Sequence, residues 1–191
     1  YIKIQDNKGV QEMNETVKKL VQEYGSEIVE NRRYLHAHPE LSFHETETAR
    51  WIRNRLKKAG IPMLEGISGN STVGYLKGSK PGPAIGLRAD IDALGLVEEN
   101  DLPYKSIFSG VMHGCGHDAH TAILMAAAEL LARHQELIEG TVYFVFEQAE
   151  EFLPGGAIQL VKDGIMDKID YMFAIHVNAL SPIGTIDVHE G

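Results

Sequence analysis

Cysteine is almost absent from this sequence, because Cys115 is the only one among 191 residues. A single thiol cannot form an intrachain disulfide, so nothing in the cysteine content marks an oxidising compartment, and we expect a cytoplasmic protein. Long apolar runs are missing too, since no stretch approaches the roughly 20 residues that a membrane-spanning helix needs. Residues 1–7 also lack the basic and apolar pattern of a signal peptide. The sequence therefore predicts no membrane partner.

Basic charge is scarce as well. Lys and Arg number 18 against 27 Asp and Glu, which gives a formal net charge of −9. Such a chain is a poor match to a phosphate backbone, so we expect no nucleic-acid partner. The hydrophobic fraction of 43%, in contrast, is too high for a disordered chain. The length suits one domain that buries a core without disulfides or structural zinc.

What the sequence does contain is an alternation of helical patterns with short apolar runs. Helices are predicted at residues 14–36, 119–134 and 156–162, the first with Gly25 inside it. A further helix is predicted to begin with a capping box of Ser42 and Glu45, to continue at helical spacing to Ala59, and to stop at Gly60. Strands are predicted at 72–76, 84–89, 141–146 and 171–177, with 183–188 as a further candidate. The runs at 141–146 and 171–177 are typical of buried strands. This order predicts an α/β fold with a mostly parallel sheet flanked by helices.

Polar residues follow three of the predicted strands, and such sheets bind ligands at the carboxyl ends of their strands. The strand at 84–89 runs into Asp90 and Asp92, the strand at 141–146 leads to Glu150 and Glu151, and the last one reaches His176. The segment that leads into the helix at 119–134 and its first turn hold His113, Cys115, His117, Asp118 and His120. Carboxylates, imidazoles and a thiol are therefore expected at one edge of the sheet.

The chemistry of these residues favours a metal site. Cys115 and His117 are separated by Gly116, which allows a tight turn, and a thiolate with an imidazole suits zinc and similar divalent ions. Adjacent carboxylates at a strand end point in different directions, so one of Glu150 and Glu151 can bind a metal while the other holds a water as general base. A helix-entry loop and a solvated pair of charges remain the alternatives. We interpret His36 and His38, next to Pro39, as structural.

Five ordered motifs carry a resemblance to a known family: HAHPELSFHE (36–45), LRADIDAL (87–94), MHGCGHDAHTA (112–122), AEE..PGGA (149–157) and AIHV (174–177). Together they resemble the aminoacylase/carboxypeptidase family of dinuclear metallopeptidases and amidohydrolases. The branch that they resemble contains hippurate hydrolases, N-acetyldiaminopimelate deacetylases and indole-acetyl-amino-acid hydrolases. The resemblance covers about residues 30–191 and implies a zinc-exopeptidase-like catalytic domain.

The resemblance also implies roles for single residues. Cys115, His117, Glu151 and His176 would bind one or two divalent metal ions: zinc, manganese, cobalt or nickel. Glu150 would be the general base, and Asp92 would be the acidic residue that orients a ligand. The substrate would be an N-acyl amino acid or a short peptide, cleaved at its amide bond.

Members of this family are nearly twice as long as this chain. We therefore interpret residues 1–191 as the N-terminal portion of the catalytic domain. A lid or dimerisation domain, which would form a homodimer, and a C-terminal segment with one more His ligand would lie outside it. The chain also departs from the family by having Gln148-Ala-Glu-Glu in place of Gln-Pro-Ala-Glu-Glu, and Gly95 in place of a proline.

Two other functions remain open from the residues. In the first, the protein is a cysteine hydrolase in which His117 or His113 activates Cys115. In the second, the chain is a metal-binding fragment without catalytic turnover.

Overall fold

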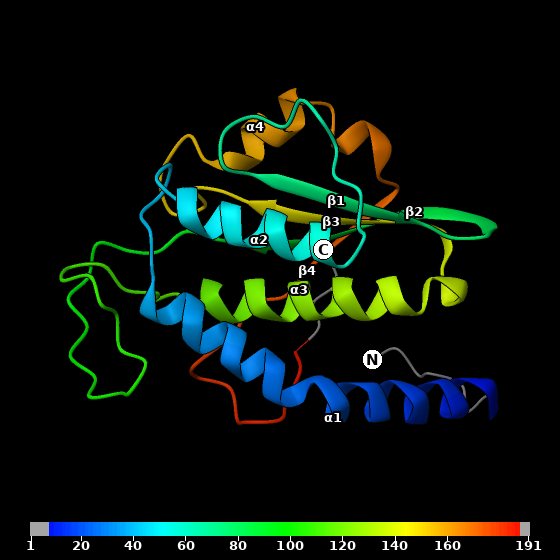
Figure 1. Ribbon diagram of the computed structural model, residues 1–191, viewed down its shortest axis with the longest axis horizontal. Helices are drawn as coiled ribbons and strands as arrows, with labels where there is room; N and C mark the ends of the chain where they lie inside the picture. Colours follow the sequence, from blue (N-terminus) through cyan, green and yellow to red (C-terminus); the bar gives the residue numbers. More distant parts are fainter. Residues whose placement is uncertain (1–7, 188–191) are drawn as a thin grey trace.

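The computed structural model describes residues 8–187 as an α/β domain (Figure 1). The helices and strands follow the order α1 (Lys8–Ala37), α2 (Thr46–Lys58), β1 (Thr72–Lys77), β2 (Lys80–Asp90), α3 (His117–Arg133), β3 (Glu139–Glu147), α4 (Gly156–Lys162) and β4 (Tyr171–Ala174). Short 3₁₀ turns lie at Gln135–Leu137 and Met166–Lys168. The predicted fold class is confirmed, and α1 continues through Gly25 without a break.

The strands form one sheet in the order β1-β3-β2-β4. β2 is parallel to both β3 and β4, whereas β1 is antiparallel to β3. The sheet is therefore mostly parallel, as predicted. The carboxyl ends of β2, β3 and β4 consequently lie at one edge, which is where the candidate ligands were expected.

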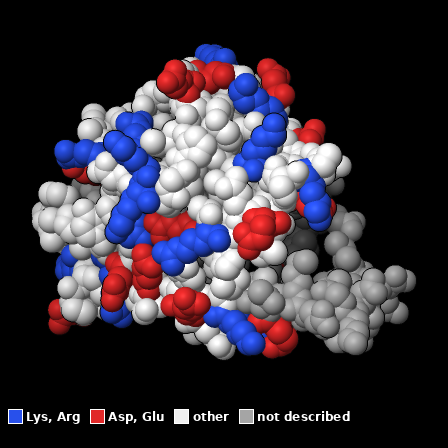
Figure 2. Space-filling view, turned by 45° about the vertical axis from the view of Figure 1, so that its right-hand side comes forward, with Lys and Arg blue, Asp and Glu red and all other residues white. Residues whose placement is uncertain are grey.

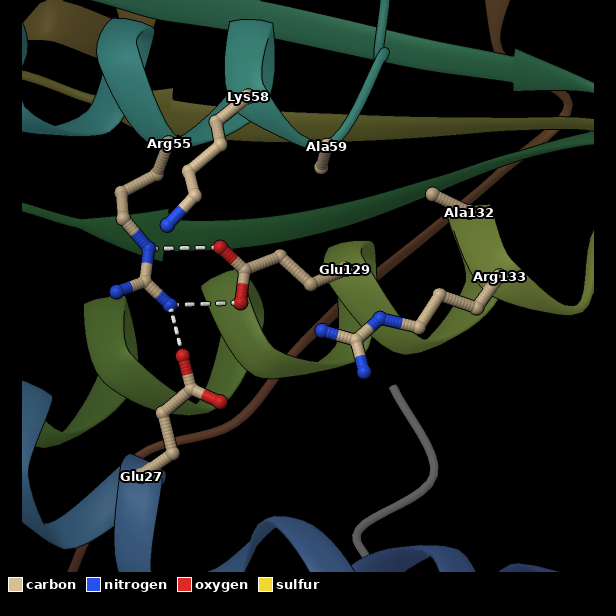
Figure 3. A pocket seen from close by; sticks show the side chains of 7 residues that line it. All are labelled: Glu27, Arg55, Lys58, Ala59, Glu129, Ala132 and Arg133. Carbon is tan, nitrogen blue, oxygen red and sulfur yellow. Dashed lines mark hydrogen bonds and ion pairs between the residues drawn. The ribbon is translucent and has the colours of Figure 1, made fainter.

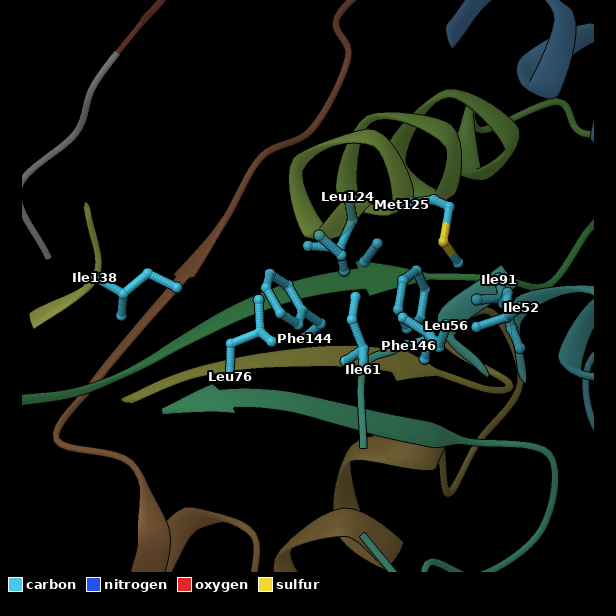
Figure 4. Close-up of a cluster of buried hydrophobic side chains, with 12 residues drawn as sticks. Ile52, Leu56, Ile61, Leu76, Ile91, Leu124, Met125, Ile138, Phe144 and Phe146 are labelled. Atoms are coloured by element: carbon cyan, nitrogen blue, oxygen red, sulfur yellow. The ribbon is translucent and has the colours of Figure 1, made fainter. Parts of the chain in front are cut away.

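Helices cover both faces of the sheet (Figure 1). α2 and α3 pack on one face, α4 lies on the other, and α1 packs against the outside of α3. Alternate residues of β3 supply both cores, because successive strand side chains point to opposite faces. Phe144 and Phe146 pack with Met125 on the α3 side (Figure 4), and Val145 packs with Leu160 on the other side. β3 is thus buried on both faces, as predicted.

The beginning of α2 differs from the prediction. Glu45 forms no side-chain cap, and its carboxylate instead accepts a hydrogen bond from the backbone N–H of Ala149 at 2.7 Å. Ser42 donates to Asp92 at 2.7 Å. The carboxylate of Glu40 accepts the N–H groups of the first helical turn and so caps α2. The predicted capping box is therefore wrong, because tertiary partners take both of its side chains.

The last strand also differs from the prediction. β4 ends at Ala174, and Tyr171 and Phe173 are 60% and 57% exposed rather than buried. β4 lies at the edge of the sheet, where it pairs with β2 alone among the described strands. Residues 183–187 form no strand, and Val188 lies outside the described residues.

The described surface mixes charges of both signs. On the face shown in Figure 2, Lys and Arg side chains lie next to Asp and Glu side chains. Within residues 8–187 no helix combines the length and the apolar character needed to cross a membrane.

Candidate metal centre

The ends of three neighbouring strands bring the predicted site residues together. Asp90 is the last residue of β2, Glu150 and Glu151 follow β3, and His176 follows β4. Because these strands are parallel, their ends share one edge of the sheet, and α3 begins there with His117. The structure therefore places carboxylates and imidazoles at the edge that the sequence predicts.

Three overlapping groups of potential ligands lie at this edge. In each group one ligand atom per residue lies within 4.8 Å of the others; the groups are Cys115, His117 and His176; His117, Glu150 and Glu151; and Asp90, His117 and His120. His117 belongs to all three. Its Nε2 is buried and has no hydrogen-bond partner among the described residues. Since a buried polar atom without a partner is costly, this nitrogen marks a position for a ligand.

Asp92 orients the ring of His117. Its Oδ1 lies 3.1 Å from His117 Nδ1, while its Oδ2 accepts hydrogen bonds from Ser42 Oγ at 2.7 Å and from the backbone N–H of Glu151 at 3.0 Å. Burial alone would raise the pKa of Asp92, but these hydrogen bonds lower it to about 2. A charged carboxylate at Nδ1 holds the proton of His117 there, which leaves the lone pair of Nε2 free for a metal ion.

Cys115 and His176 meet from different segments of the chain. Cys115 Sγ lies 3.4 Å from His176 Nε2, and His176 Nδ1 lies 2.7 Å from the backbone oxygen of Val177. His176 Nδ1 thus donates to that carbonyl, and Nε2 faces the thiol. Gly116 has a φ of +88°, and a Cβ there would lie 2.2 Å from Val177 Cγ2. Only glycine fits at this close approach, in agreement with the predicted tight turn.

The surroundings of Cys115 do not favour a free nucleophile. Burial raises the pKa of the thiol, and the carboxylates of Glu151 and Glu150 raise it further, to about 11. A nucleophilic cysteine needs a lowered pKa and positive surroundings. His113, the other candidate activator, belongs to none of the three ligand groups, and burial lowers its pKa to about 4. The geometry therefore disfavours a cysteine hydrolase.

Glu150 and Glu151 both approach the open nitrogen of His117. Glu150 Oε2 lies 3.9 Å and Glu151 Oε1 lies 3.7 Å from His117 Nε2. The expectation that the two carboxylates point apart is wrong, because an oxygen of each lies within 4.8 Å of the other and of His117. The Glu150 side chain is 41% exposed and that of Glu151 24%. A more exposed Glu150 beside a more enclosed Glu151 agrees with a base next to a ligand, and this division stays a prediction.

His120 is a site residue to which the sequence analysis assigned no role. Its Nδ1 lies 2.7 Å from Asp90 Oδ1, and its Nε2 accepts a hydrogen bond from the backbone N–H of Val177 at 2.9 Å. Arg88 binds the other oxygen of Asp90 at 2.7 Å. The group of Asp90, His117 and His120 is thus the least open of the three, because two members already bind within the protein. The spacing of His117 and His120, three residues apart on one helix face, was the available signal.

His36 is structural, as the sequence analysis proposed. Its Nδ1 lies 2.8 Å from Asp118 Oδ2, and its Nε2 lies 3.1 Å from Glu98 Oε1. Arg32 binds the same oxygen of Asp118 at 2.7 Å. These contacts join α1 to the first turn of α3, one residue from His117.

His38 also makes a local contact, since its Nδ1 lies 2.7 Å from the backbone oxygen of Tyr34.

A separate cavity of about 250 Å³ lies where the last turns of α2 and α3 meet α1 (Figure 3). It is lined by Glu27, Arg55, Lys58, Ala59, Glu129, Ala132 and Arg133. Arg55 donates to both carboxylate oxygens of Glu129 at 2.7 Å and also to Glu27. Charges of opposite sign therefore bind one another in this cavity, which we call the interhelical charge cluster.

Fold and site together define an α/β domain with a candidate metal centre at the carboxyl ends of its parallel strands. The model of the family described as Peptidase family M20/M25/M40 matches residues 86–191, more than half of the chain, and the chain belongs to this family. The resemblance drawn from the five sequence motifs is thereby confirmed.

Relatives and a solved structure extend this result. Thermostable carboxypeptidase 1 of Saccharolobus solfataricus is 40% identical over 179 residues, which are 93% of this chain and 46% of the relative. The N-acyl-L-amino acid amidohydrolase of Geobacillus stearothermophilus is 41% identical over 163 residues, 85% of this chain and 44% of the relative. The Bacillus subtilis YXEP protein, described as a dinuclear metal binding peptidase from the M20 family, superposes with a TM-score of 0.84 at 39% identity. That match covers 89% of this chain and 47% of the other. The chain thus spans less than half the length of each.

Proposed function

We propose that the protein containing this chain hydrolyses the amide bond of an N-acyl amino acid or a short peptide, with one or two divalent metal ions. The observation that carries this proposal is the buried, open Nε2 of His117 among thiol, imidazole and carboxylate groups. Relatives named as an amidohydrolase and a carboxypeptidase support an amide or peptide bond as the target. The dinuclear metal binding of the related structure supports the metal.

Four residues would hold the metal in this proposal: Cys115, His117, Glu151 and His176. Their donors fit a divalent ion, because thiolate and imidazole suit zinc, imidazole also suits nickel, and carboxylate suits manganese. When bound, such an ion lowers the pKa of a water molecule and polarises a carbonyl group. Asp92 keeps the donors in place, since it binds both the ring of His117 and the backbone of Glu151.

Glu150 is the proposed general base. It accepts the proton of the attacking water and then delivers it to the leaving nitrogen. Its partial exposure leaves room for water, and its distance of 3.9 Å from His117 Nε2 keeps the carboxylate beside the proposed ligands.

Inhibition separates this proposal from its alternatives. In the full-length protein, a chelator should abolish hydrolysis of acetylated amino acids, and added zinc, manganese or cobalt should restore it. Alkylation of Cys115 with the metal bound should leave activity, since a coordinated thiolate is not free to react. A cysteine hydrolase would show the reverse pattern. If the chain only binds metal and has no catalytic role, the full-length protein should bind metal and still show no turnover.

We further propose that residues 1–191 form the N-terminal portion of the catalytic domain. The lengths of the relatives and the exposed apolar side chains of β4 support this division. On this proposal the remaining chain supplies a lid or dimerisation domain, the contact of a homodimer and one more His ligand. The single cysteine agrees with a cytoplasmic location.

The division can be tested by comparing residues 1–191 with the full-length protein, each loaded with metal and assayed with hippurate and acetylated amino acids. We expect kcat/KM of the shorter chain to be lower by about 10²-fold or more, because misplacement by about 1 Å can cost that much. Equal values would show that the site is complete within these residues.

A further inference from the structure

Two turns beside the candidate metal centre hold non-glycine residues with positive φ. Phe43 has a φ of +66° and Ala149 one of +50°, and they are the only such residues within the described part of the chain. This conformation is unfavourable for L-residues and persists only where neighbouring groups enforce it. Ala149 directly precedes Glu150. Its backbone therefore sets the direction in which the chain enters Glu150.

A buried carboxylate holds the turn at Ala149. The side chain of Glu45 is 0% exposed; its Oε1 accepts the backbone N–H of Ala149 at 2.7 Å, and its Oε2 accepts Asn70 Nδ2 at 3.1 Å. Asn70 also donates from Nδ2 to the backbone oxygen of Phe43 at 3.3 Å and from its backbone N–H to Gln148 Oε1 at 2.6 Å. One hydrogen-bond network thus joins both strained turns.

The helix that follows Glu45 does not account for its burial. Burying a carboxylate is costly unless hydrogen bonds compensate it. A helix cap could supply them, but Glu40 already caps α2 by accepting the N–H groups of Glu47 and Thr48 at 3.1 and 2.8 Å. Glu45 instead accepts the backbone N–H of Ala149, which lies beyond the end of β3.

We propose that Glu45 is a positioning residue for hydrolysis: its carboxylate holds Ala149 in the left-handed conformation and thereby aims Glu150 at the water beside His117. This inference rests on the proposed role of Glu150 as general base. Glu151 has a second anchor, because its backbone N–H donates to Asp92 at 3.0 Å. Loss of Glu45 should therefore disturb the base more than the metal ligand.

Substitutions in the full-length, metal-loaded protein test this inference. Glu45→Ala and Glu45→Met both remove the acceptor, and Met keeps the length of the side chain. We expect kcat to fall about 10²-fold, the loss for a misplacement of about 1 Å. KM and bound metal should change by less than about threefold, because a group that acts only in the transition state changes kcat alone. Glu45→Gln retains an oxygen for Ala149 and should keep kcat within about tenfold of the original value.

A rescue and a control separate positioning from general stability. Ala149→Gly in the Glu45→Met background should recover part of kcat, since glycine adopts this φ without steric cost. Glu40→Ala is the matched control, because it also removes a carboxylate that accepts backbone N–H groups; it should lower Tm and leave kcat unchanged. Hydrogen exchange gives a readout without substitution, and the Ala149 amide of the original protein should be protected.

Several results would overturn the inference. These are a folded Glu45→Ala or Glu45→Met protein with the original kcat, a Glu45→Gln protein as slow as Glu45→Met, an equal loss of kcat in Glu40→Ala, and an unprotected Ala149 amide. The proposed function fails separately, if Glu150→Gln itself retains kcat. An inactive Glu150→Gln protein beside a fully active Glu45→Met protein overturns only the role of Glu45.

Discussion

Charged groups gather at both ends of α3, and the two ends use them in opposite ways. At the C-terminal end, in the interhelical charge cluster, Arg55 binds Glu129 and Glu27, so opposite charges satisfy one another (Figure 3). At the N-terminal end, Asp92 satisfies one nitrogen of His117 and leaves the other buried and open. The presence of charged groups therefore does not by itself distinguish the candidate site from a structural cluster. What distinguishes the site is a buried imidazole nitrogen that has no hydrogen-bond partner within the described part of the chain and lies among further ligand groups. The Nδ2 of Asn31, beside Arg55, also lacks a partner there, but it is an amide donor and cannot bind a metal ion.

The largest effect should come from the two glutamates at the open end. Glu150→Gln in the full-length enzyme should retain metal but lose kcat by about 10²–10⁴-fold, because an amide cannot accept the proton of water. Glu151→Gln should lose metal as well. Steady-state kinetics together with metal analysis after dialysis measure both. A Glu150→Gln enzyme that keeps most of its activity would contradict the assignment.

Removing the thiol should weaken metal binding next most strongly. Cys115→Ser replaces a thiolate with a hydroxyl, which rarely binds these ions, so metal affinity should fall by more than about tenfold; even residues that only support ligands cost 10–100-fold. Metal retained against graded chelator concentrations measures the loss. Glu129→Gln is the control, because Glu129 lies at the C-terminal end of α3 in the interhelical charge cluster. This variant should keep its metal. Equal retention in both proteins would remove Cys115 from the ligand set.

The interhelical charge cluster should respond in stability alone. Glu129→Ala leaves the largely buried guanidinium of Arg55 with Glu27 as a charged partner and Asn31 as a neutral one, and the free energy of unfolding should fall by about 1–3 kcal/mol. Urea unfolding measures this change. Metal affinity and kcat should stay at their original values. A loss of metal binding in this variant would break the distinction between the two ends.

The smallest effect should be the contribution of His36 to the pH dependence of the free energy of unfolding. Like Arg55, His36 contacts groups of opposite charge, Asp118 and Glu98. The hydrogen bond to Asp118 raises the pKa of His36 above its ordinary 6.5 against the opposing effect of burial, and Glu98 raises it further. Between the unfolded and folded pKa values only the folded protein keeps the proton of His36. The stabilisation by protonated His36 is therefore complete below the unfolded pKa and is lost as pH rises through the folded pKa. Urea unfolding from about pH 6 to about pH 9 should show this loss. The same slope in His36→Gln would exclude His36 as its source.

Sequence patterns located the sheet edge well because the information there is local. The apolar runs that precede Asp90 and Glu150 predict strands, and the polar groups follow within a few residues of each strand end. Ser42 and Glu45 were assigned wrongly because their partners, Asp92 and Ala149, lie 50 and 104 residues away. A spacing that suits a helix cap suits these distant partners equally well, and nothing local distinguishes them.

Burial of β4 was mispredicted for a related reason. The aromatic side chains of Tyr171 and Phe173 indicate a strand with a hydrophobic face. They do not indicate which element, if any, covers that face. In the described chain β4 is an edge strand with β2 as its neighbour, and both side chains remain exposed. Hydrophobicity thus predicted the strand, while its exposure depended on topology.

Formation of the proposed ligand set also depends on the way in which β4 joins the sheet. Cys115 and His117 come from one short turn, whereas β4 delivers His176 through only four paired positions, the first between Ile85 and Tyr171. Pairing residues so far apart in sequence closes a long loop, which is slow. In the proposed ligand set, an ion that requires His176 binds only after β4 has paired. The free energy of metal binding would then stabilise the pairing of β4 with β2. The metal would thus stabilise a short edge strand that has exposed side chains.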